Sequence, residues 1–62
     1  MTYAEAIKAL RKKMLITQTE LAAQLGVAFV SVNRWENGAY EPTMKAKRKL
    51  AALFDRYGIE VK

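Results

Sequence analysis

Residues 28–36 combine one guanidinium with two apolar side chains that lie outside the predicted core stripe of this stretch. Arg34 is its only long cation, and a guanidinium can donate two hydrogen bonds at once to O6 and N7 of guanine. Phe29 and Val30 cannot hydrogen-bond a base, but both can pack against the methyl group of thymine. Val30 and Arg34 are four residues apart, so they share one face of a helix. This chemistry predicts base contacts to thymine methyl groups and to one guanine.

Each of these side chains also has a simpler interpretation. Phe29 and Val30 can be ordinary core residues, but helix 28–36 would then be apolar nearly all round, and a helix this short has one stripe to bury. Val32 and Trp35 already supply that stripe, which favours a core role for Trp35 over a stacking platform. Arg34 can instead contact a phosphate or remain solvated.

Four helices are predicted from apolar spacing and from start signals, over residues 3–14, 18–25, 28–36 and 44–57. Two of them open with a capping box, Thr2 with Glu5 and Thr17 with Glu20. Ala28 offers no capping hydroxyl, which should cost about 1 kcal/mol. The predicted stop residues are Gly26, Asn37 or Gly38, and Gly58.

The spacing of apolar residues predicts an all-α fold, a compact bundle of four or five short helices. The predicted inner residues are Tyr3, Ile7, Leu10, Met14, Leu21, Ala22, Leu25, Val32, Trp35, Ala46, Leu50, Leu53 and Phe54 or Tyr57. We expect one domain, residues 1–62, in which residues 17–38 form a helix-turn-helix unit. A chain of 62 residues buries only about 60% of its unfolded surface, so the stability margin is small.

Composition narrows the function classes. The chain has no cysteine and no histidine, which argues against disulfides, zinc sites and most catalytic nucleophile–base pairs. We therefore expect no enzyme activity, no cofactor and no small-molecule ligand. No apolar run reaches the roughly 20 residues of a membrane span, and the expected location is cytoplasmic. The net charge of +5 favours a polyanionic partner such as nucleic acid.

Residues 17–38 resemble the helix-turn-helix of phage repressor and Cro-like (Xre-type) proteins. The matching residues are Gln18, Glu20-Leu21-Ala22, Leu25-Gly26-Val27, Val32, Trp35-Glu36-Asn37-Gly38 and Pro42. The resemblance extends into both flanking helices and so covers nearly the whole chain. The chain departs from the pattern at Ala28, at the apolar Phe29 and Val30, and in having one long helix after residue 43.

The resemblance implies a site as well as a fold. In this family the positions of Gln18 and Asn37 contact DNA phosphates. The positions of Phe29, Val30 and Arg34 point into the major groove and contact base edges. Read from the residues alone, Gln18 can also be an ordinary solvated glutamine, and Asn37 can simply end its helix.

The resemblance also implies an internal ion pair between the positions of Arg11 and Glu36. The residues are consistent with this, because each borders an apolar stripe, although two unrelated surface charges are the alternative. Further phosphate contacts are predicted for Asn33, for Lys45 near the loop 39–42, and for Lys47.

Two function classes are carried forward. The first is a sequence-specific regulator of transcription that binds double-stranded DNA through helix 28–36, as a homodimer on a two-fold operator. Ile59, Val61 and the outer face of helix 44–57 are candidates for the dimer surface. The second is a protein-interaction module on the same fold, an antitoxin or a partner-binding regulator, in which Phe29 and Val30 form a hydrophobic hot spot.

Overall fold

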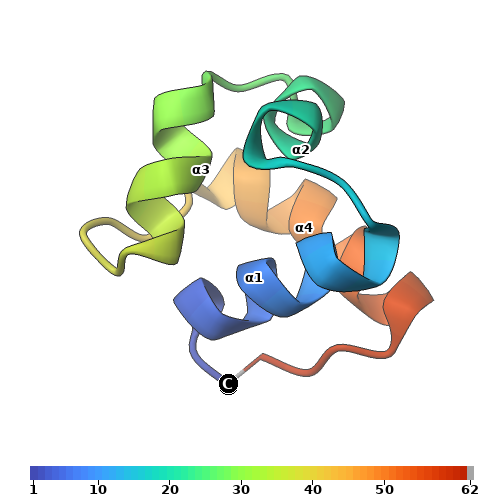
Figure 1. The fold of residues 1–62 in the computed structure, drawn as a ribbon. Coiled ribbons are helices and arrows are strands. Elements are labelled where there is room, and N and C mark those ends of the chain that lie inside the picture. Colours follow the sequence, from blue (N-terminus) through green and yellow to red (C-terminus); the bar gives the residue numbers. More distant parts are fainter. Residues whose placement is uncertain (62) are drawn as a thin grey trace.

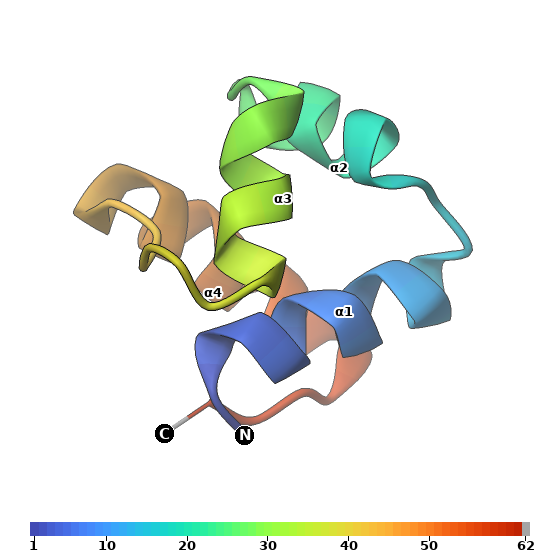
Figure 2. The ribbon, with the colours of Figure 1, turned by 60° about the vertical axis from the view of Figure 1, so that its left-hand side comes forward.

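The computed structural model describes residues 1–61, and over this range it contains four helices and no strand. These are α1 (Tyr3–Met14), α2 (Gln18–Leu25), α3 (Phe29–Glu36) and α4 (Met44–Tyr57). The all-α prediction is confirmed, with four helices rather than five. Among residues 1–61 no helix has the length and apolar character needed to cross a membrane. Figure 1 shows α2 and α3 joined by a short connection, with α1 and α4 packed against them, and Figure 2 shows the same bundle from another side.

The two predicted capping boxes are confirmed. The hydroxyl of Thr17 accepts from the backbone N–H of Glu20 at 3.1 Å, and the Glu20 carboxylate accepts from the Thr17 N–H at 2.9 Å. Thr2 and Glu5 form the same reciprocal box at the start of α1. Each box satisfies two backbone donors that a helix terminus otherwise leaves unpaired. Ala28 precedes α3 with no side-chain cap.

The turn after α2 and the turn after α3 both need a residue with positive φ. Gly26 ends α2 at φ +70° and sends the chain directly into α3. After α3, Asn37 remains right-handed at φ −82°, and Gly38 takes the left-handed conformation at φ +76°. Of the two predicted stop residues, Gly38 is therefore the one that reverses the chain.

One hydrophobic core joins all four helices. The buried apolar residues are Ala6, Ile7, Leu10, Leu21, Ala22, Leu25, Val32, Trp35, Ala46, Leu50, Phe54 and Ile59. Most of the predicted inner residues are among them; Tyr3, Met14, Leu53 and Tyr57 pack at its edge, and Ala6 and Ile59 were not foreseen. Because α2 and α3 both bury one stripe here, the core fixes which side of α3 faces solvent.

The segment after α4 folds back onto the core. The backbone N–H of Ile59 donates to the carbonyl of Phe54 at 2.8 Å, and the Ile59 side chain is buried. The prediction that Ile59 belongs to a dimer surface is wrong, because its side chain is part of the core of its own chain. Apolar and charged residues alternate in this short tail, and that pattern alone does not show which apolar residue is buried against the bundle.

Candidate nucleic-acid interface

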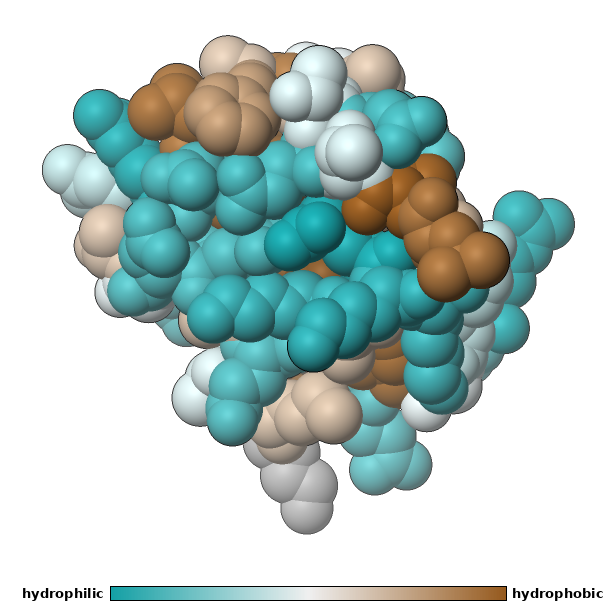
Figure 3. Space-filling view, in the orientation of Figure 1, coloured by the Kyte–Doolittle hydropathy of each residue, from teal (hydrophilic) through white to brown (hydrophobic). Residues whose placement is uncertain are grey.

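The outward side of α3 begins with two apolar side chains. Phe29 is 50% exposed and Val30 is 45% exposed, whereas Val32 and Trp35 lie in the core. Arg34 is exposed one turn after Val30. Figure 3 shows hydrophobic surface at the N-terminal end of α3 and hydrophilic surface across the middle of the same face. Phe29 and Val30 are thus not core residues, so the alternative of a fully buried pair does not hold.

Arg11 and Glu36 meet between α1 and the end of α3. The Arg11 Nε–H donates to Oε2 of Glu36 at 2.5 Å, and the Nη2–H donates to Oε1 at 2.8 Å. Glu36 is only 4% exposed, so this two-point contact neutralises a carboxylate that the fold has removed from water. The pair connects α1 with α3 through two residues that are 25 positions apart in the sequence.

Two opposing effects act on the Glu36 carboxyl. Burial acts to raise its pKa, while hydrogen bonds from Arg11 and Gln18, with the charges of Arg11 and Lys8, act to lower it. The lowering effects win, and the pKa of Glu36 lies below its ordinary value. The hydrogen bond to Glu36 likewise raises the pKa of Arg11. Both groups therefore stay charged around neutral pH.

Three amide side chains extend the hydrogen bonds of Glu36, one from the start of α2 and two from α3 and its C-cap. Gln18 donates through Nε2 to Glu36 Oε1 at 3.1 Å. Asn33 donates through Nδ2 to Oε1 of Gln18 at 3.2 Å, and Asn37 donates through Nδ2 to Oδ1 of Asn33 at 3.2 Å. An ionised carboxylate can only accept hydrogen bonds, so Gln18 must point its amide N–H toward Glu36 and its oxygen toward Asn33. Asn33 must then donate to Gln18, and its own oxygen accepts from Asn37. We call Gln18, Asn33 and Asn37 the amide row.

The amide row keeps donors available for a ligand. A side-chain amide has two N–H bonds, and each member of the row uses one of them within the chain. The remaining N–H groups, with the exposed Asn37 at the end, can donate to an acceptor outside the protein. The structure thus brings together three residues predicted to contact phosphate, although the sequence alone did not indicate that they bond to one another.

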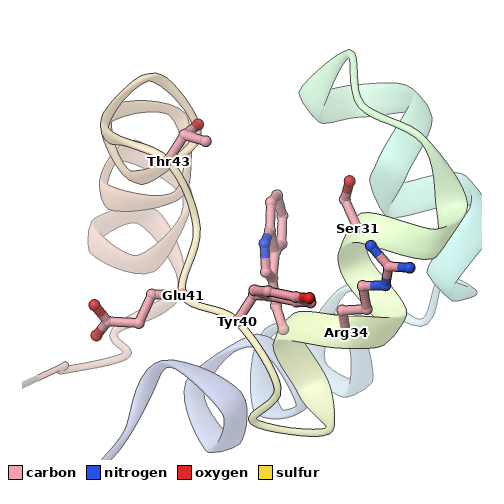
Figure 4. Close-up of a pocket in the computed structure, with 6 residues that line it drawn as sticks. Ser31, Arg34, Tyr40, Glu41 and Thr43 are labelled. Atoms are coloured by element: carbon pink, nitrogen blue, oxygen red, sulfur yellow. The ribbon is translucent and has the colours of Figure 1, made fainter.

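The other side of α3 faces the loop that leads to α4. The Arg34 guanidinium lies over the ring of Tyr40, with Cζ 5.4 Å from the ring centroid. This contact lies in a pocket of about 260 Å³ lined by Ser31, Arg34, Trp35, Tyr40, Glu41 and Thr43. Figure 4 shows the Tyr40 and Arg34 side chains next to each other there. Tyr40 was not predicted to belong to the site, because the sequence pattern places it only in the loop 39–42. The only available signal was Gly38, whose turn brings the loop back beside α3.

The basic residues of α4 differ in whether they contact other groups of the chain. Lys47 lies 3.7 Å from a Glu41 carboxylate oxygen and over the ring of Tyr3, and Lys49 donates to the Leu25 carbonyl at 3.0 Å. Lys49 therefore caps the end of α2, where a cation also suits the helix dipole. Lys45 is exposed, and of the two lysines predicted to contact phosphate it is the more accessible.

Within the described residues 1–61, no three His, Cys, Asp or Glu side chains are grouped so that they could hold a metal ion. The α3 surface instead presents amide N–H donors, the Arg34 guanidinium and the apolar side chains of Phe29 and Val30. Such a surface is complementary to a DNA major groove, which presents hydrogen-bond acceptors and thymine methyl groups.

The arrangement of α2, the Gly26 turn and α3 is that of a helix-turn-helix protein. The second helix, α3, has polar and apolar side chains on its outward side. The chain belongs to the Helix-turn-helix family, in its Xre-like form, and the family model matches residues 7–61.

Two curated relatives agree with this assignment. The chain is 44% identical over 45 residues to the HTH-type transcriptional regulator DicA of Escherichia coli (strain K12), a match that covers 73% of this chain and 33% of DicA. It is 39% identical over 49 residues to an uncharacterized HTH-type transcriptional regulator of Archaeoglobus fulgidus, covering 79% of this chain and 69% of that protein. The match thus spans about a third of DicA. No solved structure gave a significant match.

Proposed function

We propose that residues 1–62 act as one domain that binds double-stranded DNA sequence-specifically, with α3 in the major groove. On this proposal Phe29, Val30 and Arg34 contact base edges, and Gln18, Asn33, Asn37, Lys45 and Lys47 contact phosphates. The protein acts in the cytoplasm as a regulator of transcription.

The observation that carries the proposal is the exposed Phe29–Val30 pair beside Arg34. A short helix that buries Val32 and Trp35 has no structural need for two more large apolar groups on its outer side. The N-terminal half of a recognition helix is the part that meets base edges. Apolar groups there suit thymine methyls, and the guanidinium one turn later suits guanine.

The amide row supports the phosphate assignment. Phosphate contacts orient a protein on DNA, and amide donors of fixed direction at the edge of the recognition helix suit that role. The net charge of +5 adds a sequence-independent attraction to the DNA backbone. One such domain spans few base pairs, so we propose binding as a homodimer to half-sites about one helical turn apart.

Selection from a randomised pool of double-stranded DNA tests this function. The protein should enrich a motif containing thymine and one guanine, and Arg34→Ala should lose its preference at that guanine. Lys12→Ala, which removes an exposed cation from α1, is the matched control and should enrich the same motif. Affinity should fall steeply with salt, because phosphate binding releases counterions.

An interaction module is the competing function, and the half-exposed apolar pair is the feature that favours it. If no motif is enriched even at low salt, the DNA-binding proposal is wrong. Salt-insensitive binding to a protein that is lost with Phe29→Ser would then support the interaction module.

A further inference from the structure

We propose that Tyr40 is a positioning residue for Arg34, which restrains the guanidinium for recognition of one guanine. This inference rests on the proposed function, because it concerns the same DNA-facing surface. It adds a specificity role for a loop residue that does not itself need to touch a base.

The backbone places Tyr40 beside Arg34. The Gly38 N–H donates to the Trp35 carbonyl at 3.1 Å, and the Ala39 N–H donates to the Arg34 carbonyl at 3.0 Å. With Gly38 at positive φ, these bonds close the end of α3 and return the chain alongside its last turn. Ala39, the residue directly before Tyr40, is thus hydrogen-bonded to the backbone of Arg34.

The other end of the loop is also held. Pro42 is buried, and the Thr43 hydroxyl caps α4 by accepting from the Ala46 N–H at 3.3 Å. Tyr40 therefore sits in a short segment anchored on both sides. Tyr40 is nevertheless 62% exposed, so burial in the core does not explain its position.

The Tyr40 ring instead contacts the Arg34 guanidinium. A cation 5.4 Å from a ring centroid is within the range of a cation–π interaction. Within residues 1–61 the Arg34 side chain makes no hydrogen bond, so its N–H donors remain available while the ring holds the group. The nearby Glu41 carboxylate points away from Arg34 in Figure 4 and pairs with Lys47. The ring, not a carboxylate, therefore restrains this guanidinium.

Restraint matters because an arginine side chain loses much rotamer freedom when it forms two hydrogen bonds to one base. A ring that limits this freedom before binding lowers the entropic cost of the contact. Tyr40 should thus increase the preference for guanine over another base at the Arg34 position, more than it increases affinity for DNA in general.

The test compares affinity for the selected DNA with affinity for the same DNA carrying another base at that guanine. Tyr40→Leu should reduce this ratio about two- to fivefold, because it keeps an apolar side chain without a π face. Tyr40→Phe should retain the ratio, since the ring remains. In an Arg34→Ala background, Tyr40→Leu should change the ratio no further. An equal loss of affinity for both DNAs, or the same loss with Arg34→Ala, would overturn the inference.

A measurement without DNA separates this inference from the proposed function. In the free protein, the Arg34 Nε–H resonance should be shifted by the ring, retain that shift with Tyr40→Phe, and lose it with Tyr40→Leu. If Tyr40→Leu leaves the resonance unchanged, the positioning role is wrong even where Arg34→Ala abolishes guanine preference. If Arg34→Ala leaves guanine preference intact, the assigned base contact is wrong, and the inference fails with it.

Discussion

The two ends of α3 are built in opposite ways. At its C-terminal end Glu36 is buried, paired with Arg11 and bonded to Gln18, from which the amide row extends. At its N-terminal end Ala28 provides no cap, and Phe29 and Val30 are half exposed. The charged group at the C-terminal end is paired within the chain, whereas the apolar side chains at the N-terminal end remain partly exposed to solvent.

This difference separates stability from recognition within a helix of eight residues. Removing a partner at the C-terminal end leaves a buried charge, whereas removing a side chain at the N-terminal end exposes little. Breaking the pair of Arg11 and Glu36 should therefore chiefly change the free energy of unfolding, and substitutions at Phe29 or Val30 should chiefly change DNA affinity.

The largest effect should come from Arg11→Met. Methionine keeps an apolar stem but leaves the Glu36 carboxylate, 4% exposed, without its cation. Breaking one partner of a buried pair costs about 3–5 kcal/mol, a large part of the stability of a small domain. Urea unfolding followed by circular dichroism should show this loss or an unfolded protein.

Two variants sharpen that result. Lys12→Met removes an exposed neighbouring cation from α1 and should change the free energy of unfolding by about 0.5 kcal/mol or less. Adding Glu36→Leu to Arg11→Met should recover much of the loss, because no buried charge is then unpaired. A wild-type melting temperature for Arg11→Met would show that the pair does not stabilise this end of α3.

Acid should lower the free energy of unfolding by less than Arg11→Met does, because protonation neutralises Glu36 without removing the groups around it. Its pKa in the folded protein lies below the ordinary 4.5, against burial, owing to the bonds from Arg11 and Gln18. The unfolded chain therefore binds the proton first as pH falls below about 5, and the free energy of unfolding decreases until the folded-state pKa is passed.

An NMR titration of the Glu36 carboxyl carbon measures this directly and should give a midpoint below 4.5. The Arg11→Met/Glu36→Leu variant should lose less stability than the wild type across the same acid range. A midpoint above 4.5 would mean that burial outweighs the hydrogen bonds, contrary to the arrangement described.

Much of the fold could be predicted because its signals are local. The box of Thr17 and Glu20 spans four residues, and the stripe of Val32 and Trp35 follows from helix spacing alone. These patterns gave the helix bounds to within a residue: α3 begins at Phe29, with Ala28 just outside it. Exposure of Phe29 follows from the same reasoning, because the inward stripe determines the outward side.

The side-chain network could not be predicted in the same way. Arg11 and Glu36 are 25 residues apart, and only a family resemblance suggested that they meet. The direction of the amide row depends on Gln18 reaching that buried carboxylate, which requires α2 and α3 to be packed first. Tyr40 was missed for a related reason: its contact with Arg34 depends on where the Gly38 turn returns the chain.

At the N-terminal end, Phe29→Ser should reduce affinity for the selected DNA about five- to tenfold, because roughly half of a phenylalanine's burial energy is available to a ligand. Stability should change by about 1 kcal/mol or less, since the side chain is already half exposed. Leu15→Ser, at an 89% exposed apolar position after α1, is the control and should leave DNA affinity unchanged. A greater loss of stability than of affinity would place Phe29 with the structural end of the helix.

The smallest effect should come from Ala28→Ser, and its sign is opposite. Ala28 already has the extended backbone of an N-cap, φ −74° and ψ 149°, but no side-chain acceptor. Its carbonyl accepts from the Ser31 N–H at 3.0 Å, which partly satisfies the first turn. We therefore expect a gain of about 0.5–1 kcal/mol, toward the lower end of what a capping hydroxyl contributes. Thermal unfolding should detect this as a rise of about 2–8 °C.

The matched control is Ala23→Ser, which places the same hydroxyl on an exposed site inside α2 and should slightly destabilise the protein. Ala28→Ser leaves Phe29 and Val30 in place, so affinity for the selected DNA should change less than about twofold if side-chain contacts decide recognition. A larger fall in affinity together with the gain in stability would mean that the uncapped first turn must adjust when α3 binds. Stability and recognition would then share this end of the helix, and the division between the two ends of α3 would not hold.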